Sequence, residues 1–207
     1  MGNVRIPKQG RGIHTKNRII KAAFQLFAQK GIHGTNSNEI AKRAGVSTGS
    51  FYSYFKNKKT LLLEMLEDYL DRHYMMIWKQ LSTYKTNELT LEDIKSIIKN
   101  TFDAYTIQPE FHRQTHALRY SDPDINRVYE RERNREIEQV RFLIEQNSTA
   151  LRIKDPVAAA IVLHNTVENV AHTIKFIGTE IDEKRLLNTL SELIYGFFSK
   201  DDPKELT

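Results

Sequence analysis

The sequence contains no cysteine, so it can form neither disulfide bonds nor metal sites built on thiolates. It also has no apolar run approaching the ~18 residues that a membrane-spanning helix needs. Its first residues lack the apolar segment that a secretory signal peptide requires. We therefore expect a soluble cytoplasmic protein without a membrane segment.

Motifs for catalysis and cofactor binding are missing as well. The chain has no glycine-rich phosphate loop, no nucleophile elbow and no His-Glu-x-x-His pattern. Two sets of residues do stand at helical spacing: His112 with His116, and His164 with Glu168 and His172. Four-residue spacing puts each set on one helix face, but this spacing is common and the first pair has no third ligand. The sequence predicts structural or ligand-contacting histidines, with no metal, no cofactor and no enzyme activity.

Acidic residues are scarce at the start of the chain. Residues 1–60 contain 12 Lys and Arg but a single acid, Glu39, which gives this segment a net charge of +11. Because the whole chain carries +5, the remaining residues carry −6. This asymmetry indicates a polyanionic partner for the first segment and not for the second. A basic face that is simply solvated is the alternative, and the motif in the same segment argues against it.

Two short helices joined by a tight turn are predicted within this basic segment, between Thr35 and Lys58. Gly45 can take the positive φ that the end of the first helix requires, and Ser47 caps the second helix. Phe51 and Phe55 lie four residues apart and predict a buried face. The remaining side chains of the second helix then point outward or lie at its edge: Thr48, Gly49, Ser50, Tyr52 and Tyr54. A helix-turn-helix with such a surface is typical of DNA-binding domains.

Many residues in and around this motif stand at fixed spacing: Ile19-Ile20-Lys21-Ala22-Ala23-Phe24-Gln25-Leu26-Phe27, Gly31, Thr35, Ile40-Ala41, Ala44-Gly45-Val46-Ser47, Gly49, Tyr52, Tyr54-Phe55 and Lys58. With them, residues 15–62 resemble the N-terminal domain of TetR-family transcriptional regulators, and the resemblance does not extend to the rest of the chain. It implies that base edges are approached by Thr48, Gly49 and Tyr52, and that phosphates are held by Asn36, Ser50, Tyr54 and Lys58. Ser37 replaces the apolar residue or Arg common at its position, so whether it packs, caps or touches a base stays open.

Helical periodicity continues through the chain, and no strand pattern occurs. After the motif, helices are predicted over about 58–81 and 91–107, from Pro109, from Asp122-Pro123, from Asp155-Pro156 to Gly178, and from Asp182. A first helix is predicted over 15–29, preceded by a disordered basic arm over 1–14 whose contact with DNA stays open. The helix that follows Pro123 carries charges of alternating sign, which we assign to its exposed side. The predicted fold is all-α: a three-helix helix-turn-helix domain over residues 1–60, then a larger helical effector-binding and dimerisation domain over 61–207.

The last two predicted helices carry more apolar surface than a core-facing helix needs. In the last helix this surface comprises Leu186, Leu187, Leu190, Leu193, Ile194, Phe197 and Phe198. Small residues over 158–160 in the preceding helix permit close helix approach. This additional apolar surface predicts a two-fold homodimer interface through these two helices. Burial of the same surface in a large monomer core is the alternative.

Aromatic and polar side chains of the second domain are candidates for an effector pocket, since pockets combine apolar walls with a few polar anchors. The candidates are Tyr74, Trp78, Phe102, Tyr105, His116, Tyr120, Asn165, Glu168 and Asn169. Ordinary core packing is the alternative for each of them. The net negative charge of this domain argues against a polyanionic effector, and the aromatic residues favour an apolar or cationic one.

Together these features predict a ligand-responsive, homodimeric, DNA-binding transcriptional regulator. The resemblance implies a repressor that a small-molecule effector releases from its double-stranded DNA operator. An architectural DNA binder without an effector is the second hypothesis, and specific footprinting separates the two. The effector, the operator sequence, the regulated genes and the sign of regulation do not follow from the sequence.

Overall fold

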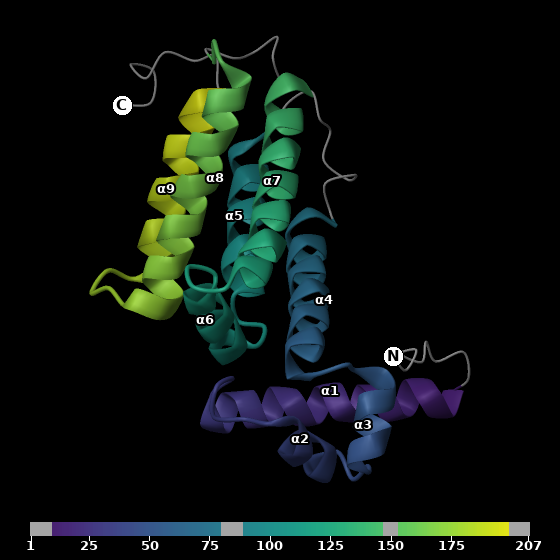
Figure 1. The fold of residues 1–207 in the computed structure, drawn as a ribbon. Coiled ribbons are helices and arrows are strands. Elements are labelled where there is room, and N and C mark those ends of the chain that lie inside the picture. The colour runs from purple at the N-terminus through teal and green to yellow at the C-terminus, as the bar shows by residue number, and fades with distance from the viewer. Residues whose placement is uncertain (1–9, 80–88, 147–152, 199–207) are drawn as a thin grey trace. The chain divides into compact units, whose positions relative to one another are not determined.

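The computed structural model describes residues 10–79, 89–146 and 153–198, and within those ranges every regular element is a helix (Figure 1). The predicted all-α fold is thereby confirmed. The chain divides into two compact units. Unit 1 comprises Met1–Tyr69 and Glu110–Val128, and unit 2 comprises Leu70–Pro109 and Tyr129–Thr207. The functional domains predicted over 1–60 and 61–207 stay a prediction.

Helix α1 (Gly10–Lys30) opens unit 1 and is longer than predicted. Residues 10–14, which we expected in a disordered arm, are helical, because no proline lies between Pro7 and Thr15 and the Thr15 hydroxyl donates to the carbonyl oxygen of Arg11 at 3.0 Å. Residues 1–9 of the predicted arm lie outside the described residues. The helix ends at Gly31, whose φ is +77°, and the next side chain, Ile32, is buried, which confirms the predicted stop.

Helix α6 (Pro109–Leu118) holds the C-terminal end of α1 within unit 1. The Phe111 ring lies edge-on to Phe24, with ring centroids 4.9 Å apart. The Gln114 side chain donates to the carbonyl oxygen of Phe27 at 3.0 Å and accepts from the Ile32 amide at 2.8 Å. Helix α6 therefore stabilises the junction between α1 and the helix-turn-helix that follows it.

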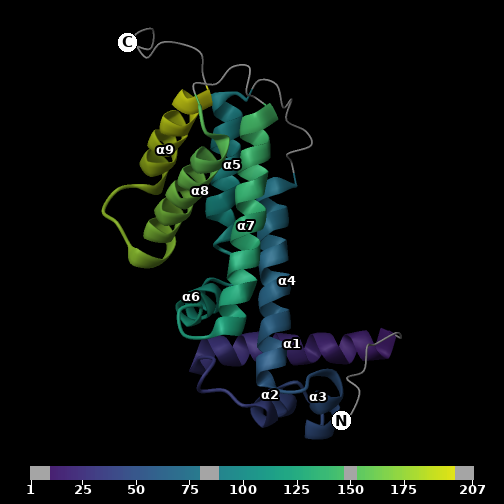
Figure 2. The ribbon, with the colours of Figure 1, turned by 45° about the horizontal axis from the view of Figure 1, so that its top comes forward.

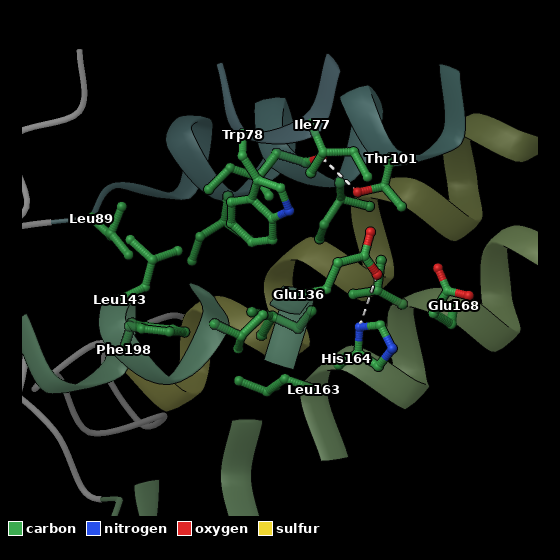
Figure 3. A pocket seen from close by; sticks show the side chains of 16 residues that line it. Ile77, Trp78, Leu89, Thr101, Glu136, Leu143, Leu163, His164, Glu168 and Phe198 are labelled. Atoms are coloured by element: carbon green, nitrogen blue, oxygen red, sulfur yellow. Dashed lines mark hydrogen bonds and ion pairs between the residues drawn. The ribbon is translucent and has the colours of Figure 1, made fainter. Parts of the chain in front are cut away.

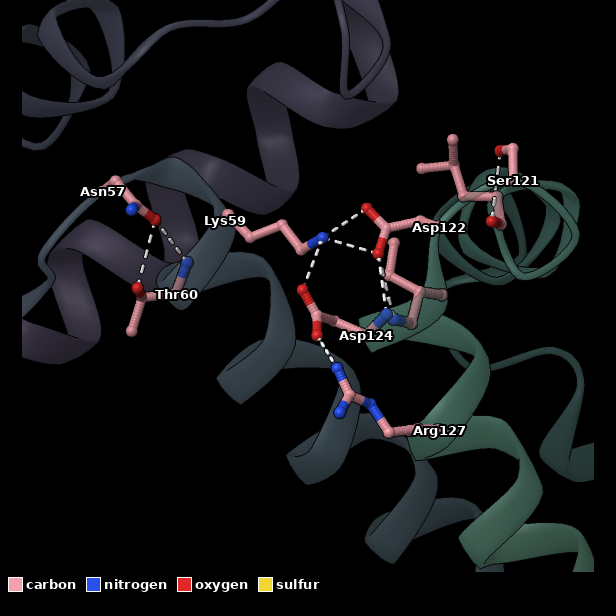
Figure 4. Close-up of polar contacts among 9 residues, drawn as sticks. Asn57, Lys59, Thr60, Ser121, Asp122, Asp124 and Arg127 are labelled. Atoms are coloured by element: carbon pink, nitrogen blue, oxygen red, sulfur yellow. Dashed lines mark hydrogen bonds and ion pairs between the residues drawn. The ribbon is translucent and has the colours of Figure 1, made fainter.

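The first turns of α4 (Lys58–Trp78) and α7 (Pro123–Gln146) are joined by an ion-pair cluster (Figure 4). The Lys59 ammonium lies 2.5 Å from the Asp122 carboxylate and 3.0 Å from that of Asp124. Asp122 also caps α7, since its Oδ1 accepts from the amides of Asp124 and Ile125. The Lys59 ammonium lowers the pKa of both carboxyls, so this stabilisation is present above their unfolded pKa and is lost as pH falls through the lowered values.

Unit 2 is built from the later turns of α4 and α7 together with α5 (Leu91–Ala104), α8 (Pro156–His172) and α9 (Glu183–Phe198). Helix α5 packs against α8 and α9, and both views show α8 and α9 side by side (Figures 1 and 2). A π-helical turn, η3 (Thr173–Ile177), extends α8 as far as Gly178, whose φ is +96°. The core of the unit comprises Ile94, Ile98, Phe102, Tyr105, Ile137, Ile144, Ala160, Leu163, Ala171, Leu190 and Ile194.

Two of the predicted helix boundaries fall at or near the ends of described segments of unit 2. Helix α5 ends at Ala104 and not at Ile107, because residues 105–108 form turns that lead into Pro109, and a residue before proline disfavours helix. The predicted end of the preceding helix at Leu81, and the break predicted over 83–90, fall largely outside the described residues. None of the described helices combines the length and apolar character that a membrane span needs.

Candidate nucleic-acid interface and internal cavity

The first helix of the motif, α2 (Ser37–Arg43), begins at a reciprocal cap. The Asn36 side chain accepts from the Glu39 amide at 3.0 Å, and the Glu39 carboxylate accepts from the Asn36 amide at 3.3 Å. The side chain of Asn36 therefore has a structural role besides the phosphate contact that the resemblance implies. Ser37 is half-buried at the first position of α2, so it does not act as the cap.

The turn between the helices follows the predicted geometry. Gly45 has φ +64°, and a Cβ at this position would come within 2.5 Å of the Arg18 guanidinium, which itself donates to the Gly45 carbonyl oxygen at 3.0 Å. Ser47 caps α3 (Thr48–Tyr54) by accepting from the Ser50 amide at 3.0 Å. Phe51 is fully buried, and so is Phe55, which follows the helix. The predicted turn, cap and buried face are confirmed.

The exposed side of α3 carries the residues for which the resemblance implies base contacts. Thr48, Gly49 and Tyr52 are all exposed, with 49% of Tyr52 accessible, and Ser50 is half-buried. Tyr54 differs, because only 8% of it is accessible. Of the two positions predicted for Tyr54, pointing outward or lying at the edge of the helix, the first was wrong, since Tyr54 lies on the same side of the helix as Phe51, three residues earlier. The DNA contacts of all these residues stay predictions.

Lys58 lies at the end of the motif, and its side chain forms hydrogen bonds within the domain. Its ammonium donates to the carbonyl oxygens of Ile32 and Thr35, each at 2.6 Å, and burial lowers its pKa. An ammonium group has three N–H donors, so one remains for a phosphate oxygen. Lys58 therefore fixes the segment between α1 and α2 while standing at the edge of the recognition surface.

Substituting Lys58→Met should show both roles. The two carbonyls lose a charged donor, so the free energy of unfolding should fall by about 1–3 kcal/mol in a urea titration. A lost phosphate contact should also lower the slope of log K against log[salt] for DNA binding by about 0.9, equally for specific and random sequences. A lower stability with an unchanged salt slope would leave Lys58 only its structural role.

Unit 2 contains an internal cavity of about 80 Å³ (Figure 3). Most of its lining is apolar: Ile77, Trp78, Leu89, Ile94, Ile97, Ile98, Val140, Leu143, Leu163, Val167, Ile194 and Phe198. Four lining residues are polar: Thr101, Glu136, His164 and Glu168. Apolar walls with a few polar groups are typical of small-molecule sites. The Trp78 Nε1–H is buried and donates to no acceptor among the described residues. Buried donors normally have a hydrogen-bond partner, and a bound ligand would supply one here.

The Glu136 carboxyl lies between two imidazoles at this cavity, and only 7% of the residue is accessible. His164 Nδ1 is 3.5 Å from one carboxyl oxygen and His73 Nδ1 is 3.8 Å from the other. Burial raises the pKa of Glu136 to about 7 and lowers that of His164 to about 4, and burial also lowers the pKa of His73. Both imidazoles are therefore neutral at pH 7, where Glu136 is about half ionised.

The position of Glu136 corrects the assignment of the α7 charges to the exposed side. Glu132 and Glu136 are both buried, one helical turn apart, and burial together with the charge of Glu136 raises the pKa of Glu132 to about 7. The signal was available in the sequence, since these positions continue the four-residue spacing that starts at the buried Val128. Alternation of charge along a helix does not by itself show which charges face water.

The predicted effector residues are not all brought together. Trp78 and Glu168 line the cavity, and Phe102 and Tyr105 belong to the adjoining core, where the Tyr105 hydroxyl donates to Glu168 at 2.5 Å. Tyr74 donates to Gln139 at 3.0 Å. The side-chain oxygen of Asn165 accepts from Arg133 at 3.4 Å, and the exposed Asn169 donates to the backbone of Asn165. His116 and Tyr120 belong to unit 1 and do not line this cavity.

The histidine sets do not form a metal centre in the part of the chain that the structure describes. No group of three His, Asp or Glu side chains there is placed to hold an ion. His112 and His116 stack, with ring centroids 5.4 Å apart. His172 lies 3.9 Å from Glu168, and its ring packs edge-on to Tyr105.

Comparison with known proteins places the motif in a family. Residues 19–65 match the family model described as bacterial regulatory proteins, tetR family. The HTH-type transcriptional regulator YuxN of Bacillus subtilis (strain 168) is 49% identical over 59 residues, which are 28% of this chain and 20% of that protein. The probable HTH-type transcriptional regulator YttP of the same organism is 32% identical over 120 residues, 58% of this chain and 56% of that protein. The chain thus spans a fifth of the first relative's length and 56% of the second's.

The fold has close counterparts among solved structures. A TetR-family transcriptional regulator from Rhodococcus sp. superposes with a TM-score of 0.69 over 90% of this chain and 100% of that one. The two sequences are 20% identical over this superposition. A likeness at this identity shows that the helical fold is shared.

Proposed function

We propose, on the premise that residues 19–65 match the tetR family of bacterial regulatory proteins, that the chain is a cytoplasmic, homodimeric repressor that a small-molecule effector releases from its operator. It is a regulator and not an enzyme. One observation carries the proposal: a helix-turn-helix with an exposed recognition surface and an internal cavity with few polar groups occur in the same chain. The first is suited to double-stranded DNA, and the second to a small molecule.

At the DNA, α3 enters the major groove and α2 crosses the backbone. Thr48, Gly49 and Tyr52 approach base edges, and phosphates are held by Asn36, Ser50, Tyr54 and Lys58. Ser37 lies at the start of α2, where the helix N-terminus favours a phosphate. The +11 charge of residues 1–60 supplies the sequence-independent part of the affinity.

The homodimer forms through α8 and α9, which together leave a set of apolar side chains exposed. On α8 these are Val157, Ile161 and Val162, and on α9 they are Leu193 and Phe197. A two-fold axis pairs each patch with its own copy, so the same residues are covered on both subunits. Pairing gives two recognition helices, which a palindromic operator requires.

Helix α4 connects ligand binding to DNA binding in this proposal, because Lys58 is its first residue and Trp78 its last. An effector that presses on Trp78 favours a conformation of α4 in which the two recognition helices are mis-spaced for the operator. Turning a 1:99 equilibrium over needs about 5.5 kcal/mol of differential affinity, so the ligand must contact several cavity residues.

Footprinting on DNA upstream of the protein's own gene tests the proposal. We expect two protected half-sites separated by about one helical turn, with specific binding at least ~10³-fold tighter than binding to random DNA. Uniform protection with no preferred site would favour the architectural DNA binder. A lasting footprint in the presence of every compound that binds the cavity would remove the effector from the proposal.

A further inference from the structure

The polar part of the cavity lining carries charge of one sign only. Among the lining residues Glu136 and Glu168 are carboxylates, and neither Lys nor Arg is present. The lining from α5 and α9 is apolar except for Thr101, whose hydroxyl donates to the carbonyl oxygen of Ile97 at 3.0 Å. A ligand that enters this cavity therefore meets two acidic groups and no cationic side chain.

The two carboxylates differ in how well they are satisfied. Glu168 accepts the short hydrogen bond from Tyr105. The described contacts of Glu136 are the imidazoles of His164 and His73, at 3.5 and 3.8 Å. A charge-assisted hydrogen bond to a carboxylate measures about 2.7–2.9 Å, so these contacts are too long to compensate the burial of an ionised group. Glu136 is therefore a buried acceptor whose charge the surrounding residues leave largely uncompensated.

We propose that the effector is an apolar organic cation bearing N–H groups, such as an alkylammonium ion, and that Glu136 is its counter-ion. The ammonium donates to the Glu136 carboxylate, and the hydrocarbon part lies against the apolar walls and the Trp78 ring. Figure 3 shows Trp78 and Glu136 in the lining of the same pocket. The claim that this ligand controls DNA binding rests on the proposed function. The claim that the cavity selects a cation rests only on the residues that line the cavity.

Ligand charge selects among the possible occupants. An anion such as a fatty acid carboxylate would be placed beside Glu136 and Glu168, and like charges in a poorly solvated site repel strongly. A neutral alcohol could accept a hydrogen bond from the un-ionised Glu136 carboxyl. It would not neutralise the negative charge of the ionised form. An ammonium ion both donates hydrogen bonds to the Glu136 carboxylate and neutralises its charge. The cavity therefore favours an ammonium ion over a carboxylate or an alcohol.

Cation binding should also release a proton. Because the pKa of Glu136 is about 7 in the free protein, the cation must displace its proton in part of the molecules at neutral pH. The other groups near this carboxyl are His73 on α4, His164 and Glu168 on α8, and Glu132 and Arg135 on α7, with Tyr105 of α5 in edge contact with His73. Burial keeps the two histidines neutral above pH 7, and Arg135 stays charged. Glu132 and Glu136, each with a pKa of about 7, are therefore the groups that titrate between pH 6 and 8, and of the two only Glu136 lines the cavity.

Three probes of equal chain length and different charge test the inference: hexylammonium, 1-hexanol and hexanoate. Trp78 is the only tryptophan of the chain, so its fluorescence reports on this cavity alone. On the wild-type protein we expect hexylammonium to bind most tightly and hexanoate least. The hexylammonium Kd should be roughly tenfold lower at pH 8 than at pH 6, because Glu136 ionises over this range, whereas the hexanol Kd should not fall as pH rises.

Variants separate Glu136 from its neighbour on the same helix. In Glu136→Gln, the affinity for hexylammonium at pH 8 should fall by about tenfold or more, and the preference for the cation over hexanol should disappear. Glu132→Gln removes a buried carboxyl one turn away that does not line the cavity, so the cation preference should persist. Thermal unfolding of both variants checks that they fold. The pH dependence of the hexylammonium Kd is measured on the wild-type protein, so this test does not depend on the folding of any variant.

The outcomes distinguish this inference from the proposed function. Equal or tighter binding of hexanol or hexanoate, an unchanged preference in Glu136→Gln, or no quenching of Trp78 by millimolar hexylammonium would each overturn the cation inference. Should hexanol release operator DNA as well as hexylammonium does, the regulator stands and the cation inference fails. If hexylammonium binds with the expected pH profile but leaves the operator complex intact, the cation site stands and ligand-controlled repression fails.

Discussion

Substituting Leu193→Asp should convert the proposed homodimer into monomers and remove specific operator binding. Leu193 lies on α9 and is 64% accessible, so a carboxylate there is solvated in the monomer and costs little folding stability. In the proposed interface the same substitution occurs on both subunits. Burying two unpaired charges should weaken dimerisation by about 4 kcal/mol or more, roughly a thousandfold, in sedimentation measurements.

Lys184→Asp is the matched control for this substitution. Position 184 is exposed and precedes Leu193 by nine residues, which places it on the opposite side of α9. An added acid in the first helical turn is also favourable for the helix. This variant should stay dimeric and bind the operator normally. A dimeric Leu193→Asp protein would show that the subunits associate through another surface, and a monomeric wild-type protein at micromolar concentration would remove the dimer from the proposal.

Phe51→Ala should abolish DNA binding by destabilising the motif. Phe51 is fully buried in α3 between Tyr52 and Phe55, so its removal leaves a cavity that costs about 3–5 kcal/mol. Binding to operator and to random DNA should both be lost at 37 °C. Quenching of Trp78 by cavity ligands should remain, because Trp78 belongs to unit 2. Circular dichroism and urea unfolding measure the loss of stability.

The adjacent residue supplies the control for Phe51. Tyr52 is half exposed, so Tyr52→Ala should change the stability by at most ~0.5 kcal/mol. It should instead weaken operator binding by about 1–3 kcal/mol while leaving binding to random DNA nearly unchanged. Equal losses on the two DNAs in the Tyr52 variant would mean that this side chain does not contact bases.

The helix-turn-helix could be predicted from the sequence because local rules determine it. Gly45 is required where φ is positive, Ser47 caps the helix that follows it, and Phe51 and Phe55 are one turn apart on the buried side. Each of these features depends on residues a few positions away in the chain. The helix starts at Pro109, Pro123 and Pro156 were predictable for the same reason.

The cavity could be predicted only in part, because its lining depends on long-range packing. The aromatic character of Trp78 and the polar character of Glu168 predict that they line a pocket, and both line the cavity. The same criteria predict His116 as a pocket residue, yet it belongs to unit 1. Glu136 is not among the predicted pocket residues, because a glutamate in a highly charged helix is normally solvated. Its four-residue spacing from Val128 does indicate the buried side of α7, but that Glu136 lies beside His73 of α4 and His164 of α8 depends on long-range packing.

Reciprocity between the cavity and the operator tests the central claim most directly. Titrations of a compound that quenches Trp78 are made with and without saturating operator DNA, and titrations of operator DNA with and without the compound. If ligand binding in the cavity controls DNA binding, each should weaken the other by the same factor, about 5- to 150-fold. A factor of one in both titrations, with Trp78 quenching intact, would show that the cavity does not regulate DNA binding.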